Sequence, residues 1–127
     1  MPLVGQQQES ICSFYATIIL VIELIYYRDE NGRSPFIEWI TALRDKIAKT
    51  RIAARLRQIE SDNFGDAKPV GEGVTELRID VGAGYRVYCG RHGQHWVILL
   101  CGGDKSSQPK DIARAKALWN EWKRRQP

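Results

Sequence analysis

Three cationic residues in the second half of the chain, Arg78, Arg86 and Lys105, could act together on a phosphodiester. The two arginines belong to neighbouring segments that alternate like strands, and Lys105 follows the apolar run 95–101. A run that is apolar on both faces is typical of a central strand, so the three side chains could converge at one end of a sheet. If the substrate is RNA, its 2′-hydroxyl attacks the adjacent phosphorus, and cations that stay protonated stabilise the charge that develops.

The same strand face carries a carboxylate and an aromatic ring. Alternation along "VTELRID" and "YRVYCG" places Glu76 beside Arg78 and Tyr88 beside Arg86. Tyr88 could stack on an unpaired base, while Lys105 could stabilise charge or act as a general acid. Glu76 fits two roles, a general base or an ion-pair partner for the arginines, and ion pairing is the commoner role for a carboxylate so placed.

Two histidines offer a further general base and a hypothetical metal site. His92 and His95 are of the residue type that titrates near neutral pH, but their position at an expected turn favours a solvated role. Together with Cys89 and Cys101 they could be read as zinc ligands. In a hairpin that turns near residue 93, however, Cys101 lies roughly 20 Å along the return strand. Zinc ligands must converge at roughly 2.0–2.3 Å, so we expect no metal and no cofactor.

The segment "CGGDKSSQPKD" around Lys105 follows the outline of a nucleotide-binding phosphate loop. The motif G-x-x-x-x-G-K-[ST] needs glycine directly before the lysine and another glycine five residues earlier, where this chain has Asp104 and Leu99. A carboxylate in the nest that should cradle a phosphate opposes binding. The sequence therefore does not predict nucleotide hydrolysis.

The elements that must position these residues can be read from periodicity. A strand is expected at 21–27, a helix that starts with Ser34 as cap and Pro35 as first residue, and a second helix at about 50–62. Strands at 74–80, 85–90 and 95–101 follow, and then a helix at 109–125. The first helix shows one apolar stripe, made of Phe36, Trp39, Ile40, Leu43 and Ile47.

This order predicts an α+β domain with a mostly antiparallel sheet of about four strands, two N-terminal helices and a C-terminal helix. We expect the helices to cover the sheet face that shows Leu77 and Ile79. The opposite face, with Glu76, Tyr88 and the two arginines, would then stay open as a polar, cationic surface.

Composition and charge narrow the class of protein. The chain has 127 residues and a formal net charge of +4, which suits one domain and mildly favours a polyanionic partner. Its three cysteines, without a C-x-x-C pair, fit reduced thiols in the cytoplasm. The apolar run 11–27 has no Lys or Arg, and Glu23 interrupts it, so it lacks the features of a signal peptide. Its uninterrupted part, 11–22, is shorter than the ~20 residues of a spanning helix, and we expect no membrane attachment.

Four segments together resemble the RelE/ParE toxin superfamily, most closely its phage-related, HigB-like branch of addiction module killer proteins. They are "FIEWITALRDKIAKTRIAARL", "KPVGEGVTELRID", "GYRVYCG" and "ILLCGGDKSSQPKDIARAKAL". The likeness runs from about Val21 to Trp122. It implies a RelE-like toxin domain over residues 21–127, with residues 1–20 as an N-terminal extension outside the match.

The resemblance also implies a function. Such proteins are toxins of type II toxin–antitoxin modules, and those with this kind of fold mostly cleave mRNA on the translating ribosome without a metal. The implied partners are a co-expressed antitoxin, expected to be of the helix-turn-helix type, together with mRNA and the ribosome. The alternative is the ParE branch, whose members inhibit DNA gyrase without being enzymes.

Residue by residue, the resemblance assigns a catalytic role to the cations of three motifs. These are Arg78 of "ELR", Arg86 of "GYR" and Lys105 of "GGDKS". We expect substrate-binding roles for three further residues, Lys68, Glu76 and Tyr88.

Overall fold

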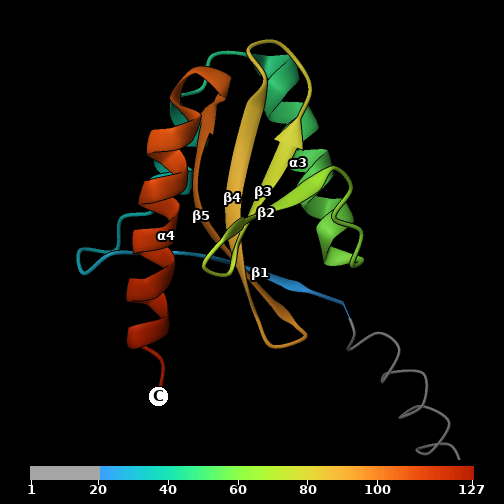
Figure 1. The fold of residues 1–127 in the computed structure, drawn as a ribbon. Coiled ribbons are helices and arrows are strands. Elements are labelled where there is room, and N and C mark those ends of the chain that lie inside the picture. The colour runs from blue at the N-terminus through green and yellow to red at the C-terminus, as the bar shows by residue number, and fades with distance from the viewer. Residues whose placement is uncertain (1–20) are drawn as a thin grey trace, which may run out of the picture.

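A mixed sheet of five strands forms the centre of the protein in this computed structural model, which describes residues 21–127 (Figure 1). The strands stand in the order β1-β5-β4-β3-β2. β1 pairs with β5 in parallel, and the other neighbouring strands pair antiparallel. Their bounds are β1 Glu23–Tyr26, β2 Ala67–Gly71, β3 Val74–Ile79, β4 Tyr85–His92 and β5 Trp96–Asp104.

The expected RelE-like sheet of about four strands is therefore wrong, because the sheet has five strands and is mixed, with one parallel pair beside three antiparallel pairs. The additional strand is β2, whose sequence "AKPVG" contains a proline and a glycine and lacks apolar alternation. Such a strand is tolerated at an edge, where β2 lies. The parallel pair arises because the chain leaves β1 through two helices and returns to its neighbour β5 only after three further strands.

Two helices cover one face of the sheet, α2 (Pro35–Ala42) and α3 (Lys46–Glu60). The predicted start of the first is confirmed, since the Ser34 hydroxyl accepts a hydrogen bond from the backbone of Ile37. The core on this side includes residues of both helices and of the central strands, among them Phe36, Ile52, Ile59, Leu77, Val87 and Leu99. The prediction that Ile47 belongs to the buried stripe of the first helix is wrong, because Ile47 lies in α3 and is 65% exposed.

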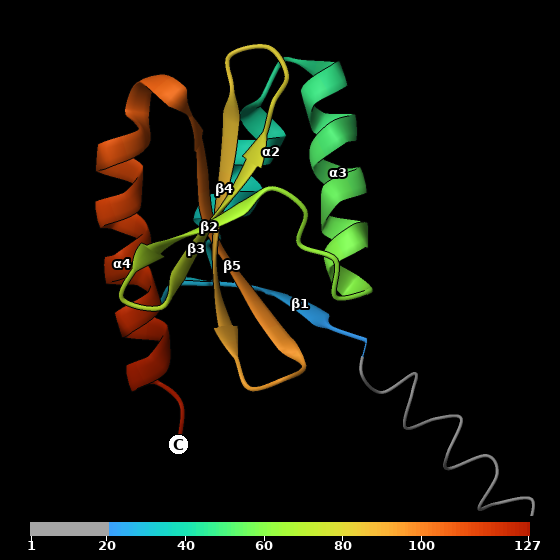
Figure 2. The same ribbon diagram turned by 45° about the vertical axis from the view of Figure 1, so that its right-hand side comes forward.

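The opposite face is covered by the C-terminal helix α4 (Gln108–Arg124), and Figure 2 shows α3 and α4 on the two sides of the sheet. The expectation that this face stays open is wrong. The apolar stripe of α4 needs an apolar partner, and β5 supplies one because it is buried on both of its faces. A second core forms there, with Tyr88, Ile98, Leu100, Ala115, Trp119 and Trp122.

Two glycines near the end of β5 allow helices to approach the strand from both sides. A Cβ atom on Gly102 would overlap the indole of Trp39, a residue of α2, whereas a Cβ on Gly103 would overlap Asp111 and Ser107 on the α4 side. Close packing therefore explains the two glycines that suggested a phosphate loop. It also brings the first turn of α4 against β5.

Within residues 21–127, none of the helices combines the length and the hydropathy that a membrane crossing requires. The predicted N-terminal extension, residues 1–20, lies outside the described residues.

Candidate functional site

A buried carboxylate organises the cationic residues on the α4 side of the sheet. Glu76, on β3, is fully buried, and its Oε1 lies 3.0 Å from Nε of Arg78 and 3.2 Å from Nε of Arg86. Its Oε2 accepts a hydrogen bond of 2.8 Å from the side-chain amide of Gln108, the first residue of α4. Both oxygens of this carboxylate are thus occupied by groups of the protein itself.

The register of the sheet explains why these three charges meet. Arg78 of β3 and Arg86 of β4 are direct partners across an antiparallel pair, and Glu76 precedes Arg78 by two residues on the same face. Two like charges directly opposite each other repel, and the carboxylate between them compensates both. Arg78 donates a hydrogen bond to it, whereas the N–H of Arg86 is not aligned with an acceptor, so that contact is a charge attraction.

The backbone of Arg78 is held separately by α3. Arg55 donates from Nη2 to the carbonyl of Arg78 at 2.7 Å, and from Nη1 to the carbonyls of Phe64 and Asp66 at 3.3 Å each. This arginine therefore serves the fold, and it fixes the strand from which Arg78 projects. The Arg78 side chain itself stays 35% exposed, against 11% for Arg86.

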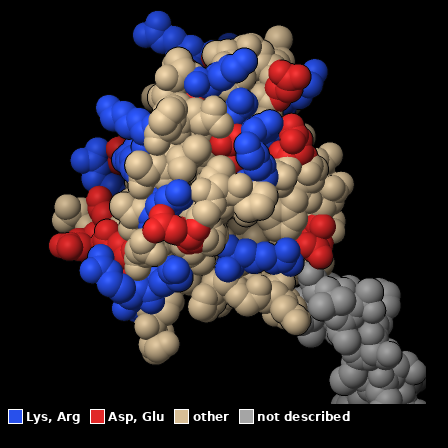
Figure 3. All heavy atoms as spheres, in the orientation of Figure 1, with Lys and Arg blue, Asp and Glu red and all other residues tan. Residues whose placement is uncertain are grey.

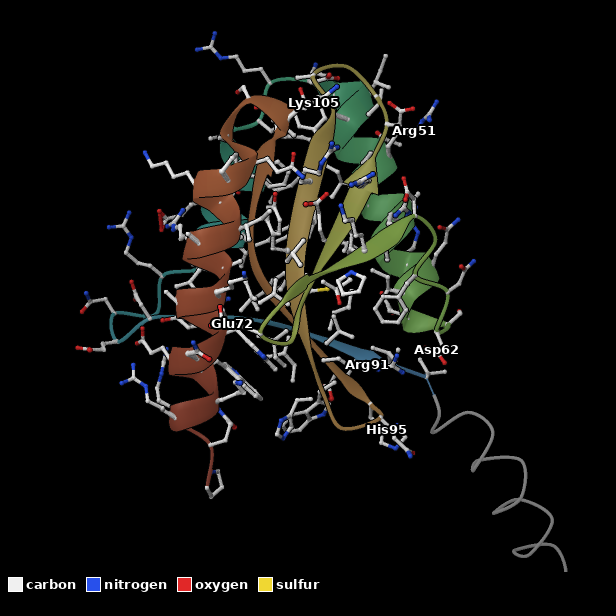
Figure 4. All side chains as sticks on the ribbon, in the orientation of Figure 1. Arg51, Asp62, Glu72, Arg91, His95 and Lys105 are labelled. Atoms are coloured by element: carbon white, nitrogen blue, oxygen red, sulfur yellow. The ribbon has the colours of Figure 1, made fainter. Side chains whose placement is uncertain are left out.

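Lys105 lies at the end of β5, next to Arg86. It opens the short helix η1 (Lys105–Ser107), and its side chain is exposed. A Cβ on Gly84, which has a φ of +77°, would lie 3.5 Å from Cβ of Lys105 and 3.8 Å from Nη1 of Arg86. Both cations thus border the same glycine, and Figure 4 shows Lys105 at the end of the sheet where α4 begins.

Lys68 adds a fourth cation from β2. Its Cα faces that of Glu76 across the β2–β3 pair, so the two side chains lie on one face of the sheet, and Lys68 is exposed. In the space-filling view, Lys and Arg side chains gather on this face of the molecule with a few carboxylates between them (Figure 3). The structure therefore brings Arg78, Arg86 and Lys105 together, with Lys68 one strand further out.

Two more carboxylates flank the connection between β5 and α4, Asp104 at the end of β5 and Asp111 in the first turn of α4. Asp104 caps η1 by accepting hydrogen bonds from the hydroxyl and backbone amide of Ser106, and these bonds hold the pKa of Asp104 below its ordinary value. Asp111 accepts a hydrogen bond from the Ser107 hydroxyl over Gly103, whose Cα faces that of Arg86. The positive N-terminal end of the α4 dipole adds to the positive potential of the cations at this end of the sheet.

Tyr88 lies beneath α4 rather than on an open surface. Its ring is fully buried, and its hydroxyl has no hydrogen-bond partner among the described residues. Burial, and next the charge of Glu76, raise the pKa of this phenol well above its ordinary value. In this conformation the ring offers no face to a base, which the expected substrate-binding role requires.

The histidines lie far from the cations. Six residues along β4 separate Arg86 from His92, which is about 20 Å. Figure 4 shows His95 and Lys105 at opposite ends of the molecule. Cys89 and Cys101 belong to the cores on the two opposite faces of the sheet. No group of three or more His, Cys, Asp or Glu side chains that could hold a metal occurs in the part of the chain that the structure describes.

Gln108 and Asp111 were not singled out in the sequence. The contact of Gln108 with Glu76 joins residues 32 positions apart, and a local sequence pattern does not predict a contact of this kind. The available signal was position, because both residues stand in the first turn of the helix that follows Lys105. A first turn next to a cationic loop is a natural place for residues that shape an anion site.

A protein from Haemophilus influenzae, described only as uncharacterized, is 51% identical to this chain over 86 residues. The matched stretch covers 68% of this chain and 87% of the relative. No family model matches the chain. The similarity spans most of both proteins, and the description of the relative names no activity, substrate or partner.

Proposed function

This chain belongs to the same family as the Haemophilus influenzae protein, and we propose that it is the toxin of a type II toxin–antitoxin module. Its activity is that of a metal-independent endoribonuclease, which cleaves mRNA on the ribosome, inhibits translation and arrests growth. The proposal is supported mainly by one observation, that Arg78, Arg86 and Lys105 lie close together at one end of the sheet. These cations come from the three sequence motifs that resemble the RelE/ParE superfamily.

The arrangement suits charge stabilisation during RNA cleavage. Attack of the 2′-hydroxyl on the adjacent phosphorus places extra negative charge on the non-bridging oxygens, and fixed donors lower the free energy of that state. The two arginines are held through Nε to Glu76, and Nη1 of Arg86 also donates to the carbonyls of Gly84 and Tyr85. The terminal nitrogens of Arg78 and Nη2 of Arg86 are the donors that can face a phosphate. Lys105, exposed beside Arg86, adds a third positive charge on the open side of the site.

The proposal includes the partners and the location that the resemblance implies. The toxin acts in the cytoplasm on mRNA bound to the ribosome, and a co-expressed antitoxin of the helix-turn-helix type neutralises it. No cofactor is involved. Lys68 lies where it can contact the same RNA strand one sheet position away from the arginines.

One observation favours the second candidate, a ParE-like inhibitor of DNA gyrase that is not an enzyme. Glu76 is engaged with two arginines and Gln108, and Asp104 is engaged with Ser106. Both oxygens of Glu76 are occupied, whereas Asp104 accepts through Oδ1 alone. The carboxylate beside the arginines is therefore not free to take the proton of a 2′-hydroxyl, which a nuclease needs and a binding inhibitor does not.

Induced expression separates the candidates. Early loss of protein synthesis with mRNA cut at defined positions supports the nuclease, and early arrest of DNA synthesis supports gyrase inhibition. Arg86→Ala and Lys105→Ala are expected to relieve growth arrest while the protein stays folded, whereas Arg124→Ala at the far end of α4 leaves toxicity unchanged. Fully toxic, folded Arg86→Ala and Lys105→Ala variants would refute the assignment of the site.

A further inference from the structure

We propose that Gln108 is a positioning residue, which acts through the buried carboxylate of Glu76 to aim Arg78 and Arg86 at a phosphate of single-stranded RNA. The inference rests on the proposed function for its substrate. The structural part of the inference is that one amide sets the orientation of two guanidinium groups. That part depends only on contacts within the protein.

The orientation of the Glu76 carboxylate is set by its partners. The last torsion of a glutamate side chain has a broad, roughly two-fold preference, so a glutamate does not fix by itself which oxygen faces a given partner. Here the Gln108 amide occupies Oε2 at 2.8 Å and leaves Oε1 to both arginines. Without the amide, Oε2 would be a buried acceptor without a partner, and the carboxylate would rotate to share it with a guanidinium.

The carboxylate in turn orients the two guanidinium groups. A carboxylate can bind arginine through the two terminal nitrogens or through Nε, and here Oε1 lies nearest Nε of both Arg78 and Arg86. Contact through Nε leaves both terminal nitrogens of Arg78 without another partner among the described residues. In Arg86, Nη1 also lies 3.5 Å from the backbone carbonyls of Gly84 and Tyr85, so Nη2 is the nitrogen left for an outer ligand. The two terminal nitrogens of Arg78 match two oxygens of a phosphate in bidentate geometry, and Nη2 of Arg86 adds one more donor beside them.

The residue type at position 108 suits this role. Gln108 starts α4, and its preceding residue, Ser107, makes no side-chain cap for that helix. The long amide side chain instead reaches the sheet, so the seating of the first turn of α4 and the orientation of the arginines are linked. A glutamate at this position would bring a second carboxylate to Glu76 and repel it, although its shape is nearly the same.

The experiment measures the arginines directly as well as the reaction. The Nε–H groups of Arg78 and Arg86 give nitrogen-15 NMR signals, which contact with a buried carboxylate shifts and protects from solvent exchange. In Gln108→Leu we expect both signals to move and to lose protection. We expect mRNA cleavage in a reconstituted translation reaction to slow by about 10–100-fold, the size of loss that follows removal of a group that orients a metal ligand. Gln108→Glu should have the same effects, and it provides the test of the positioning role if the leucine variant folds poorly.

The matched control is Gln126→Leu, because Gln126 also donates from its side chain, but to the carbonyl of Trp122 near the end of the same helix. It should leave both the arginine signals and the cleavage rate unchanged. In a Glu76→Gln background, Gln108→Leu should add little further loss, since the carboxylate through which it acts is absent.

The outcomes separate this inference from the proposed function. Unchanged arginine signals and unchanged cleavage in folded Gln108→Leu and Gln108→Glu would overturn the positioning role. If the wild-type protein cleaves no mRNA while both variants still release the two arginine signals, the positioning role stands and the nuclease proposal fails.

Discussion

Oε1 of Glu76 lies 3.2 Å from Nε of Arg86, although the glutamate is fully buried and the arginine side chain is only 11% exposed. A buried ion pair contributes little net stability compared with a well-packed apolar pair, because both charges must leave water. It does impose a strict geometry, since an uncompensated buried charge is costly. The pair therefore fixes where the guanidinium group points.

Removing the charge of Glu76 should destabilise the protein clearly. In Glu76→Gln the two arginines lose their common counter-charge, and we expect the free energy of unfolding to fall by about 2–4 kcal/mol, towards the lower side for broken buried pairs because Arg78 is partly solvated. Urea denaturation measures the change. The control Glu38→Gln breaks the exposed pair with Arg33 and should cost less than about 1 kcal/mol. Equal losses in the two variants would contradict this account.

Local signals in the sequence were sufficient for several elements. Ser34 followed by Pro35 specifies a helix start by capping and by a fixed φ, and the structure has that start. The apolar run before Lys105 indicates a strand buried on both faces, which β5 is. These signals act within a few residues, so they can be read without knowledge of the fold.

Contacts between distant residues could not be read in the same way. The edge strand β2 is stabilised by pairing with β3 rather than by its own sequence "AKPVG". The placement of α4 over Tyr88 depends on the second apolar face of β5. The apolar sequence of β5 indicates that both faces are buried, but it does not indicate which helix covers each face. The site residues Arg78, Arg86 and Lys105 carried recognisable motifs, whereas Gln108 joins the site only through the tertiary position of α4.

Binding of single-stranded nucleic acid should depend on salt through Lys68 and Lys105. Each cation that contacts a phosphate releases counterions, and its removal lowers the slope of log affinity against log salt by about 0.7. We expect Lys68→Ala and Lys105→Ala each to reduce the slope by this amount for an uncleavable 2′-deoxy oligonucleotide, measured by fluorescence anisotropy. Arg124→Ala is the control, because α4 places Arg124 about 24 Å from its own start. Equal slopes for Lys105→Ala and Arg124→Ala would remove Lys105 from the interface.

Stability should decrease in alkaline solution because of two buried thiols. Burial raises the pKa of Cys89 and of Cys101 from 9.0 to about 12. Below pH 9 the folded and the unfolded protein both keep the thiol protons, and the thiols then contribute fully to stability. Above pH 9 the unfolded chain releases protons that the folded protein retains. Each thiol should then lower the free energy of unfolding by about 1.4 kcal/mol per pH unit until the folded thiols titrate.

Urea denaturation under reducing conditions at pH 8 and pH 10 measures this loss. Cys101→Ala should show a smaller decrease between the two pH values than the wild type, whatever its stability at pH 8. The two proteins differ in this one side chain alone, so the difference between their pH dependences isolates the Cys101 thiol. A pH dependence identical to that of the wild type would show that Cys101 does not retain its proton.

The two neighbouring glycines of β5 allow a sharper test of how α4 is coupled to the site. A methyl group on Gly102 collides with Trp39, and one on Gly103 collides with Asp111 and Ser107. Both alanine variants should lower the free energy of unfolding by about 1–3 kcal/mol, as overpacking of a close contact does. Only Gly103→Ala, however, pushes against the turn of α4 that carries Gln108.

The arginine Nε–H signals should therefore change in Gly103→Ala and stay near their wild-type positions in Gly102→Ala, although the two substitutions are chemically identical and adjacent. Asp111→Ala should restore the signals of Gly103→Ala, since it removes the carboxylate that the new methyl group displaces. If both glycine variants change the signals equally, general loosening of the fold, rather than the seating of α4, controls the arginines.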